Sequence, residues 1–273
     1  EKPIIGVTCV ERCHLSFGHR RGNMEYVHPH TREGHKKSLD VFQKAQSDHS
    51  TASIDYEDYR PSAALSPHQV IQFNIAPATD YIDLKKTKLY LKVKITKANG
   101  GPVEMGDKVS FINMPLNTLF RQAELELQHQ SLTSGVSSCY PYKAMFDTLL
   151  KPTMGRCLDA ELFMKDRAGH LDDVDLTGNA GMLNRWAFTN RGQECELEGP
   201  LMIDILNQDR LLINGIGIVL RLYPNSNEFA LMRAGEEDFK YEITDAILRL
   251  GHHRMNAGLL SGHSDMLKAS PAL

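Results

Sequence analysis

The chain has 273 residues, of which 41% are hydrophobic and 24% charged, and its formal net charge is −3. This length supplies a core for one large β domain or two small ones, and the nearly balanced charge excludes a strong overall field that would attract nucleic acid. The five cysteines lack the short regular spacing of a disulfide framework. No apolar run reaches the ~18 residues of a transmembrane helix.

Residues 1–45 differ from the rest of the chain. They hold five of the 12 histidines and show little apolar periodicity, which predicts a poorly ordered extension. The chain begins with Glu1 rather than Met, so we expect a fragment or the translation of an incomplete reading frame. The polar residues 47–66 predict an extended lead-in to the first strand.

Strand patterns dominate the remainder. In Leu89–Thr96 apolar and polar residues alternate, which is typical of a half-buried antiparallel strand. Similar patterns predict further strands at Gln69–Ile75, Ala123–Gln130, Trp186–Thr189, Cys195–Leu197, Leu201–Leu206, Ile216–Tyr223 and Phe239–Leu250.

Pro141–Leu150 predicts a helix, because proline favours the first turn and Pro152 follows the end. Tyr142, Met145 and Leu149 would lie on one side of it. Many strands with one firm helix predict an all-β fold. We predict an antiparallel jelly-roll β-sandwich with one or two short helices over residues 46–257, followed by a truncated linker over 258–273.

The strongest local signal is residues 200–223, PLMIDILNQDRLLINGIGIVLRLY, which predicts two apolar strands around a polar loop. It carries no nucleophile, metal-ligand cluster or phosphate loop. Asx and Gly residues favour tight turns, and this role is assigned to Asn207, Asp209, Asn214 and Gly215. The residues predicted to fill the core between two sheets are Ile203, Ile205, Leu211, Ile213, Ile218, Leu220 and Leu222.

Several passages resemble the major capsid protein of Maverick/Polinton elements and the related adintoviruses. They are SLDVFQ at 38–43 with IDYEDYRPSAAL at 54–65, YIDLKKTKLYLKVKI at 81–95, INMPLNTLFRQAELELQHQSL at 112–132 with YPYKAMFDTLL at 140–150, and PLMIDILNQDRLLINGIGIVLRLYPNSNEFALM at 200–232. The resemblance implies the N-terminal roll of a double jelly-roll capsid subunit, whose second roll would follow the end of this sequence.

The resemblance also implies a function. We expect a structural protein that acts by self-assembly and is not an enzyme, with no catalytic, cofactor-binding or metal-binding residues. Its partners would be copies of itself, as homotrimers of double jelly rolls, and other capsid proteins. We expect no direct nucleic-acid site and no membrane segment. The protein would reside in the virion, and before assembly in the nucleus or cytoplasm of the host.

Two other classes of protein remain open. His28, His30 and Glu33 approach the first metal-binding motif of cupins, which would make the chain a metal-dependent enzyme. The spacing to Glu33 is short and no second motif is visible, so solvated histidines are favoured. A carbohydrate-binding jelly roll would need an exposed aromatic platform, and only 7% of the residues are aromatic.

Three smaller clusters have ordinary explanations. Cys9 and Cys13 with the histidines that follow do not have a usual zinc-finger spacing. Residues 170–175, HLDDVD, lack EF-hand order and favour a solvated acidic loop. His252 and His253 follow a predicted strand and favour a strand end or an interface.

Overall fold

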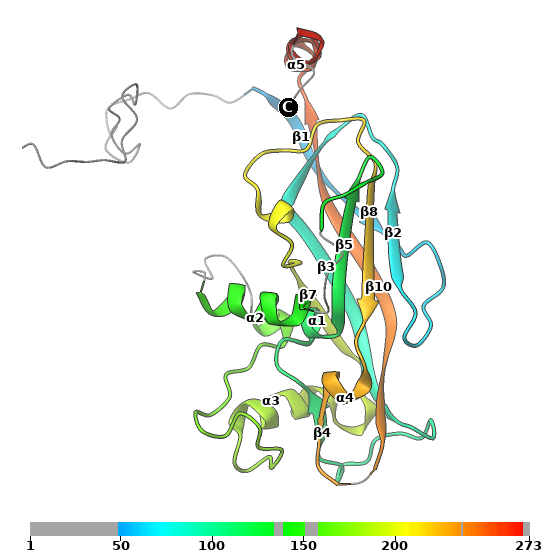
Figure 1. Ribbon diagram of the computed structural model, residues 1–273, viewed down its shortest axis with the longest axis vertical. Coiled ribbons are helices and arrows are strands. Elements are labelled where there is room, and N and C mark those ends of the chain that lie inside the picture. The colour runs from blue at the N-terminus through cyan, green and yellow to red at the C-terminus, as the bar shows by residue number, and fades with distance from the viewer. Residues whose placement is uncertain (1–48, 134–138, 151–157, 236, 270–273) are drawn as a thin grey trace, which may run out of the picture. The chain divides into compact units, whose positions relative to one another are not determined.

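The computed structural model describes residues 49–133, 139–150, 158–235 and 237–269, and its described part is built around two antiparallel sheets (Figure 1). The first sheet contains, in spatial order, β1 (Thr51–Tyr59), β10 (Phe239–Met255), β3 (Tyr81–Lys97) and β7 (Cys195–Gly199). The second contains β2 (Ile71–Ile75), β8 (Ile218–Pro224), β5 (Phe120–Leu127) and β6 (Gln130–Ser131). A small third sheet pairs β4 (Val109–Phe111) with β9 (Leu231–Arg233).

The strand order is that of a jelly roll. Counted along the chain, the eight strands of the two large sheets are joined in the orders 1-8-3-6 and 2-7-4-5. Successive strands therefore cross repeatedly from one sheet to the other, which gives the two interlocked Greek keys of this fold. The predicted all-β antiparallel jelly-roll sandwich is confirmed, but the described residues contain five α-helices where one or two short ones were predicted.

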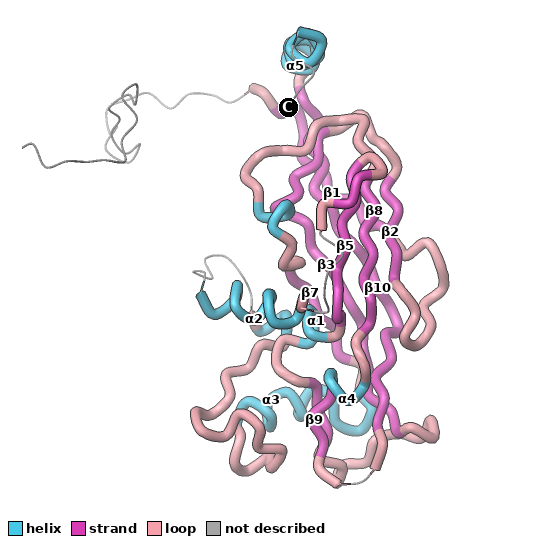
Figure 2. The backbone as a smooth tube through the Cα atoms, in the orientation of Figure 1, coloured by secondary structure: helices cyan, strands magenta, loops and turns pink. Residues whose placement is uncertain are grey.

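The helices are unevenly distributed over the roll. Figures 1 and 2 show α1 (Pro115–Thr118), α2 (Tyr140–Leu150), α3 (Ala180–Thr189) and α4 (Asn227–Ala230) toward one end of the sandwich. At the other end, α5 (Ala257–Ala269) follows β10 and occupies most of the predicted linker 258–273. The short 3₁₀ helices are η2 (Asp159–Glu161), η3 (Asn190–Gly192) and η4 (Asp204–Asn207).

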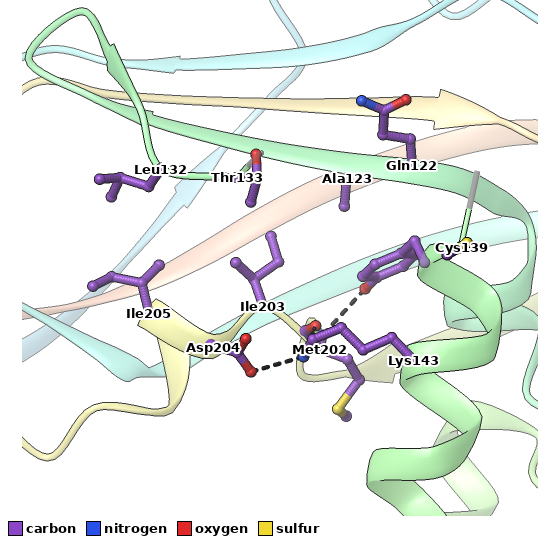
Figure 3. Close-up of a pocket in the computed structure, with 11 residues that line it drawn as sticks. Gln122, Ala123, Leu132, Thr133, Cys139, Lys143, Met202, Ile203, Asp204 and Ile205 are labelled. Atoms are coloured by element: carbon purple, nitrogen blue, oxygen red, sulfur yellow. Dashed lines mark hydrogen bonds and ion pairs between the residues drawn. The ribbon is translucent and has the colours of Figure 1, made fainter. Parts of the chain in front are cut away.

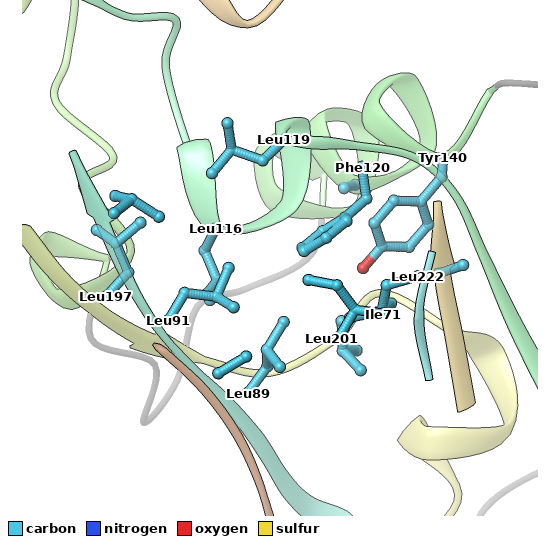
Figure 4. Packing of buried hydrophobic residues seen from close by; sticks show 14 of the residues in the cluster. Ile71, Leu89, Leu91, Leu116, Leu119, Phe120, Tyr140, Leu197, Leu201 and Leu222 are labelled. Atoms are coloured by element: carbon cyan, nitrogen blue, oxygen red, sulfur yellow. The ribbon is translucent and has the colours of Figure 1, made fainter. Parts of the chain in front are cut away.

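Alternation along the strands builds the core. In β3, Leu89, Leu91, Val93 and Ile95 are fully buried, whereas the intervening lysines point outward and pair with glutamates of neighbouring strands. Side chains of the second sheet close the core from the opposite face, and helix residues cap it (Figure 4). Burial of this single apolar layer is the main force that holds the two sheets together.

The thiol of Cys195 provides a probe of this core. It is buried in β7, and burial raises its pKa from 9.0 to about 11. Only the thiolate reacts with alkylating reagents, so at pH 8 only ~0.1% of the folded thiol is reactive. We predict that mass spectrometry of iodoacetamide-treated protein finds Cys195 unmodified under native conditions and modified in urea, while the exposed Cys139 reacts in both.

The same pKa shift predicts a dependence of stability on pH. The folded thiol keeps its proton to higher pH than the thiol of the unfolded chain. Its contribution to stability is therefore fully present below pH 9 and is lost as the pH rises toward 11. Rapid native alkylation of Cys195 at pH 8 would contradict its placement in the core.

The structure differs from the predicted strand at Trp186–Thr189, which lies inside helix α3. A polar cap starts this helix: the side-chain oxygen of Asn179 accepts hydrogen bonds from the backbone N–H groups of Gly181 and Met182. Trp186 donates its indole N–H to the carbonyl oxygen of Asp107 at 3.0 Å. The helix is thus specified by its start and by tertiary contacts rather than by apolar alternation.

Replacing Asn179 by alanine should lower the free energy of unfolding by about 0.5–2 kcal/mol. The change leaves two N–H groups at the start of α3 without their acceptor, in a buried position. Urea denaturation of the variant measures the loss. Asn179→Ser, which keeps an acceptor at the N-cap, should restore most of the stability; equal losses in both variants would contradict the capping role.

The predicted hairpin over residues 200–223 is also wrong. Residues 201–203 form no strand, and Asp204–Asn207 forms the 3₁₀ helix η4. Both edges of β8 are occupied, by β2 on one side and β5 on the other. The segment before β8 therefore cannot pair with it, and Leu212 instead forms an isolated bridge with Ile82 of β3.

Candidate assembly surface

The long connection between β6 and β7, residues 132–194, carries α2, η2, α3 and η3 at the helical end of the roll. Figure 1 shows α2 and α3 standing outside the two sheets. A connection of this length needs its own attachment to the roll, because loops without packing remain mobile. The described parts are attached by two buried polar networks.

The first network is centred on Arg185 of α3, whose side chain is completely buried. Its guanidinium donates to the carbonyl oxygens of Phe111 at 3.0 Å and Met164 at 3.3 Å. It also forms an ion pair of 3.0 Å with Asp166, which is itself almost inaccessible. Burial lowers the pKa of Arg185, and the charge of Asp166 opposes that shift. One cation therefore joins α3, β4 and the loop before α3.

Asn113 reinforces this attachment. Its side-chain N–H group donates to the Met164 carbonyl at 2.6 Å and to Asp166 at 3.1 Å. Its side-chain oxygen accepts from the backbone N–H groups of Met114 and Met164. The amide thus binds the loop at residues 164–166 to the segment that starts α1.

The second network attaches α2. The hydroxyl of Tyr140 donates to Asn117 of α1 at 2.7 Å and accepts from the backbone N–H of Met202 at 3.1 Å. The amide of Asn117 lies 3.4 Å from a carboxylate oxygen of Glu161 in η2. Three separate segments of the chain therefore meet at the first residue of α2.

The outward face of α2 is apolar. Tyr142, Phe146, Leu149 and Leu150, here called the α2 stripe, are 57–79% exposed. The inward face is formed by Tyr140, Ala144 and Thr148, which are buried. The usual arrangement of an amphipathic helix on a core is therefore inverted, since the larger apolar side chains point to solvent. Tyr142 also packs edge-to-face against Phe229 of α4.

A cavity of 270 Å³ lies beside the N-terminal half of α2 (Figure 3). Ala123 and Leu132 line one wall, and Ile203 and Ile205 line the opposite wall. Lys143 lies at its rim, where its Nζ atom is 2.8 Å from Asp204 and 3.0 Å from Asp147. Burial would lower the pKa of Lys143, but hydrogen bonds to these carboxylates raise it overall, so the rim holds one cation between two carboxylates.

The residues predicted for core and turns at 203–222 fall into three groups. Ile203, Ile218, Leu220 and Leu222 are buried, and Ile205 is half-buried in η4. Leu211 and Ile213 are only half-buried, because residues 208–215 run outside both sheets. Of the four residues predicted for turns, Asn214 and Gly215 form a turn, in which Gly215 has φ +78°. Asn207 is the last residue of η4, and Asp209 forms an ion pair with Lys85 at 2.5 Å.

Most of the residues that were weighed as possible metal ligands lie outside the described part of the chain. His28, His30 and Glu33, like Cys9 and Cys13, lie outside the described residues. In the acidic loop, Asp173 binds His170 at 3.3 Å and Asp175 binds Lys108 at 2.9 Å. Within the described ranges, no group of three or more His, Cys, Asp or Glu residues has the geometry to hold a metal ion. Nor does any described helix have the length and apolar character to cross a membrane.

His252 and His253 lie near the end of β10, as the sequence predicts for the end of a strand. His252 contacts the hydroxyl of Tyr59 at 3.1 Å, and His253 lies 3.6 Å from Asp83. These contacts join β10 to β1 on one side and to β3 on the other. The α2 stripe and the Arg185–Asp166 pair were not predicted from the sequence.

Comparisons with known proteins agree with the fold. No family model matches the chain. The uncharacterized protein F54H12.2 of Caenorhabditis elegans is 27% identical over 188 residues, which cover 66% of this chain and 43% of that protein. The chain thus spans less than half the length of this relative.

Among solved structures, the Faustovirus major capsid protein superposes with a TM-score of 0.53 and 10% identity, covering 80% of this chain and 57% of that one. The mavirus major capsid protein gives a TM-score of 0.38 at 14% identity and covers 94% of this chain and 54% of that one. At such identities the Faustovirus likeness shows the fold alone: the chain is an antiparallel jelly roll of the kind present in that capsid protein.

Proposed function

We propose that the chain is a structural subunit of a viral capsid that acts by self-assembly, belonging to the major capsid protein of a Maverick/Polinton-like virus or integrated element. The observation that carries the proposal is the eight-stranded jelly-roll order, found together with the superposition on the Faustovirus major capsid protein. The sequence passages that resemble the Maverick/Polinton proteins give the proposal its finer assignment; those at 54–65, 81–95, 112–132, 140–150 and 200–232 lie within this roll, and the passage at 38–43 lies outside the described residues.

The lengths of the similar proteins support a double-roll arrangement. The chain covers 57% of the Faustovirus protein and 43% of the nematode protein. We infer that residues 46–257 form the first of two rolls, that 1–45 are an extension, and that 258–273 lead toward the second. The partners would then be copies of the same protein, in trimers of double rolls, and other capsid proteins in the virion.

The polar residues of the helical end support a structural role. Arg185, Asp166, Asn113 and Tyr140 are used in holding segments of the chain to one another. Interfaces between copies should be large and partly apolar, and the exposed α2 stripe offers such a surface. We therefore infer that the chain functions through contacts with other subunits and not through turnover of a substrate.

Size-exclusion chromatography with light scattering tests the proposal. The protein that contains this roll and the sequence downstream of Leu273 should form trimers, and electron microscopy should show particles with a pseudo-hexagonal outline. A strict monomer at high protein concentration would contradict self-assembly.

A further inference from the structure

We propose that the α2 stripe packs antiparallel against the α2 stripe of a second copy of this chain, an inference that rests on the self-assembly proposed above. The contact would be symmetric, because the same four residues of each copy form both sides of it. Three features support a second copy as the partner: the exposed area of the stripe, the charges beside it and the order of its side chains.

The area of the stripe suits the centre of a protein interface. Its four side chains are more than half exposed, and since a large aromatic side chain can bury 150–250 Å², the stripe offers on the order of 500 Å². The largest apolar patch of a typical monomeric protein is about 300–600 Å² and is often functional. A stable interface takes about 800 Å² from each partner, so the stripe would form the apolar core and neighbouring polar groups the rim.

The charges beside the stripe favour another copy over an anionic partner. Lys143 is the sole lysine or arginine between residues 140 and 150. It is engaged by Asp147 within α2 and by Asp204 of η4. Lys143 with these two carboxylates carries a net charge of −1, so the phosphates of a lipid surface or a nucleic acid would find no free cation on this helix, whereas the apolar stripe of a second copy needs none.

The order of the side chains selects an antiparallel arrangement. The aromatic residues Tyr142 and Phe146 occupy the N-terminal half of the stripe, and Leu149 and Leu150 the C-terminal half. When two stripes cross in opposite directions about Phe146, Tyr142 of each copy meets the leucines of the other. The helix dipoles are then also opposed, which is favourable. Tyr142 is already oriented by its contact with Phe229, so less side-chain freedom is lost on association.

Sedimentation velocity on the whole chain tests this pairing with charged variants. Tyr142→Lys and Leu149→Glu should each raise the dissociation constant about tenfold or more, because each places one charge in an apolar interface. The double variant should recover affinity, since the new cation of one copy faces the new carboxylate of the other. Seven helical positions span ~10 Å, too far for these two side chains to pair within one helix, so recovery reports a contact between copies.

Met266→Lys is the matched control, because Met266 is an exposed apolar residue on α5 at the other end of the roll. It should leave association unchanged, and urea midpoints should be the same for all variants. Equal association of the wild type and both single variants would overturn this inference alone. Single variants that weaken association without recovery in the double variant would overturn the antiparallel pairing. A wild-type chain that stays monomeric would overturn the stripe pairing, whereas the proposed function fails only if the protein that also contains the sequence downstream of Leu273 stays monomeric.

Discussion

Replacing Asp166 by alanine is expected to lower the free energy of unfolding by about 3–5 kcal/mol, the cost of leaving one partner of a buried ion pair alone. Arg185 is completely buried and has Asp166 as its ion-pair partner at 3.0 Å. Two carbonyl oxygens would still accept hydrogen bonds from the guanidinium, but neither carries a full charge. Asn113 would also lose one of its acceptors.

Equilibrium denaturation in urea, followed by far-UV circular dichroism, measures this loss. Asp166→Asn is the matched control, because the amide keeps the size of the side chain and an oxygen that can accept from Arg185. It should lose clearly less stability than the alanine variant. If alanine and asparagine destabilise equally, or if the alanine variant loses less than about 1 kcal/mol, the ion pair does not hold the connection as proposed.

Phe73→Ala should also lower the free energy of unfolding by about 3–5 kcal/mol, since it removes a buried aromatic ring and leaves a cavity. Phe73 lies in the middle of β2, is fully buried, and pairs with Leu220 of β8. Close packing between the two sheets leaves little room for collapse around the missing ring. The loss of packing would therefore reach both sheets.

Phe146 provides a matched comparison for this substitution. It is the same residue type on the exposed face of α2, and Phe146→Ala should change the stability of the monomer by less than about 0.5 kcal/mol. Both variants can be compared by urea denaturation at a concentration at which the protein is monomeric. Similar losses in the two variants would mean that Phe146 is buried within the monomer.

The core strands could be predicted because their own residues carry the pattern. β3, β8 and β10 alternate apolar and polar residues. The predicted ranges Ile216–Tyr223 and Phe239–Leu250 overlap β8 and β10 closely, whereas Leu89–Thr96 covers only the second half of β3. The helix at Pro141–Leu150 was likewise marked by its prolines. In these segments local preference and tertiary burial favour the same structure.

Other elements depend on distant partners that a local pattern does not show. β1 is rich in acidic residues and becomes a strand because it pairs with β10, almost 200 positions away. α3 contains aromatic residues that favour strands, and Asn179 before it was the available sign of a helix start. The predicted hairpin does not form because β2 and β5 pair with the two edges of β8.

The exposure of the α2 stripe could not be predicted from the sequence for a similar reason. The sequence predicts Tyr142 and Leu149 on one side of α2, and this is where they lie, but periodicity alone does not say whether a face points inward. Tyr140 determines which face of α2 points inward: its hydroxyl contacts Asn117 and Met202, and the opposite face therefore points to solvent. The Arg185–Asp166 pair joins residues of different segments and has no fixed spacing that could reveal it.

The edges of the two sheets affect the form that an assembly can take. β6 has two residues, β2 and β7 have five each, and the nine-residue β1 carries Asp55, Glu57 and Asp58. Short or charged edges oppose the addition of further strands from other molecules. Continuous strand addition would produce a ribbon or fibre without a defined end. Subunits that meet instead through helices and loops are joined at angles set by side-chain packing, and a fixed angle allows a shell to close.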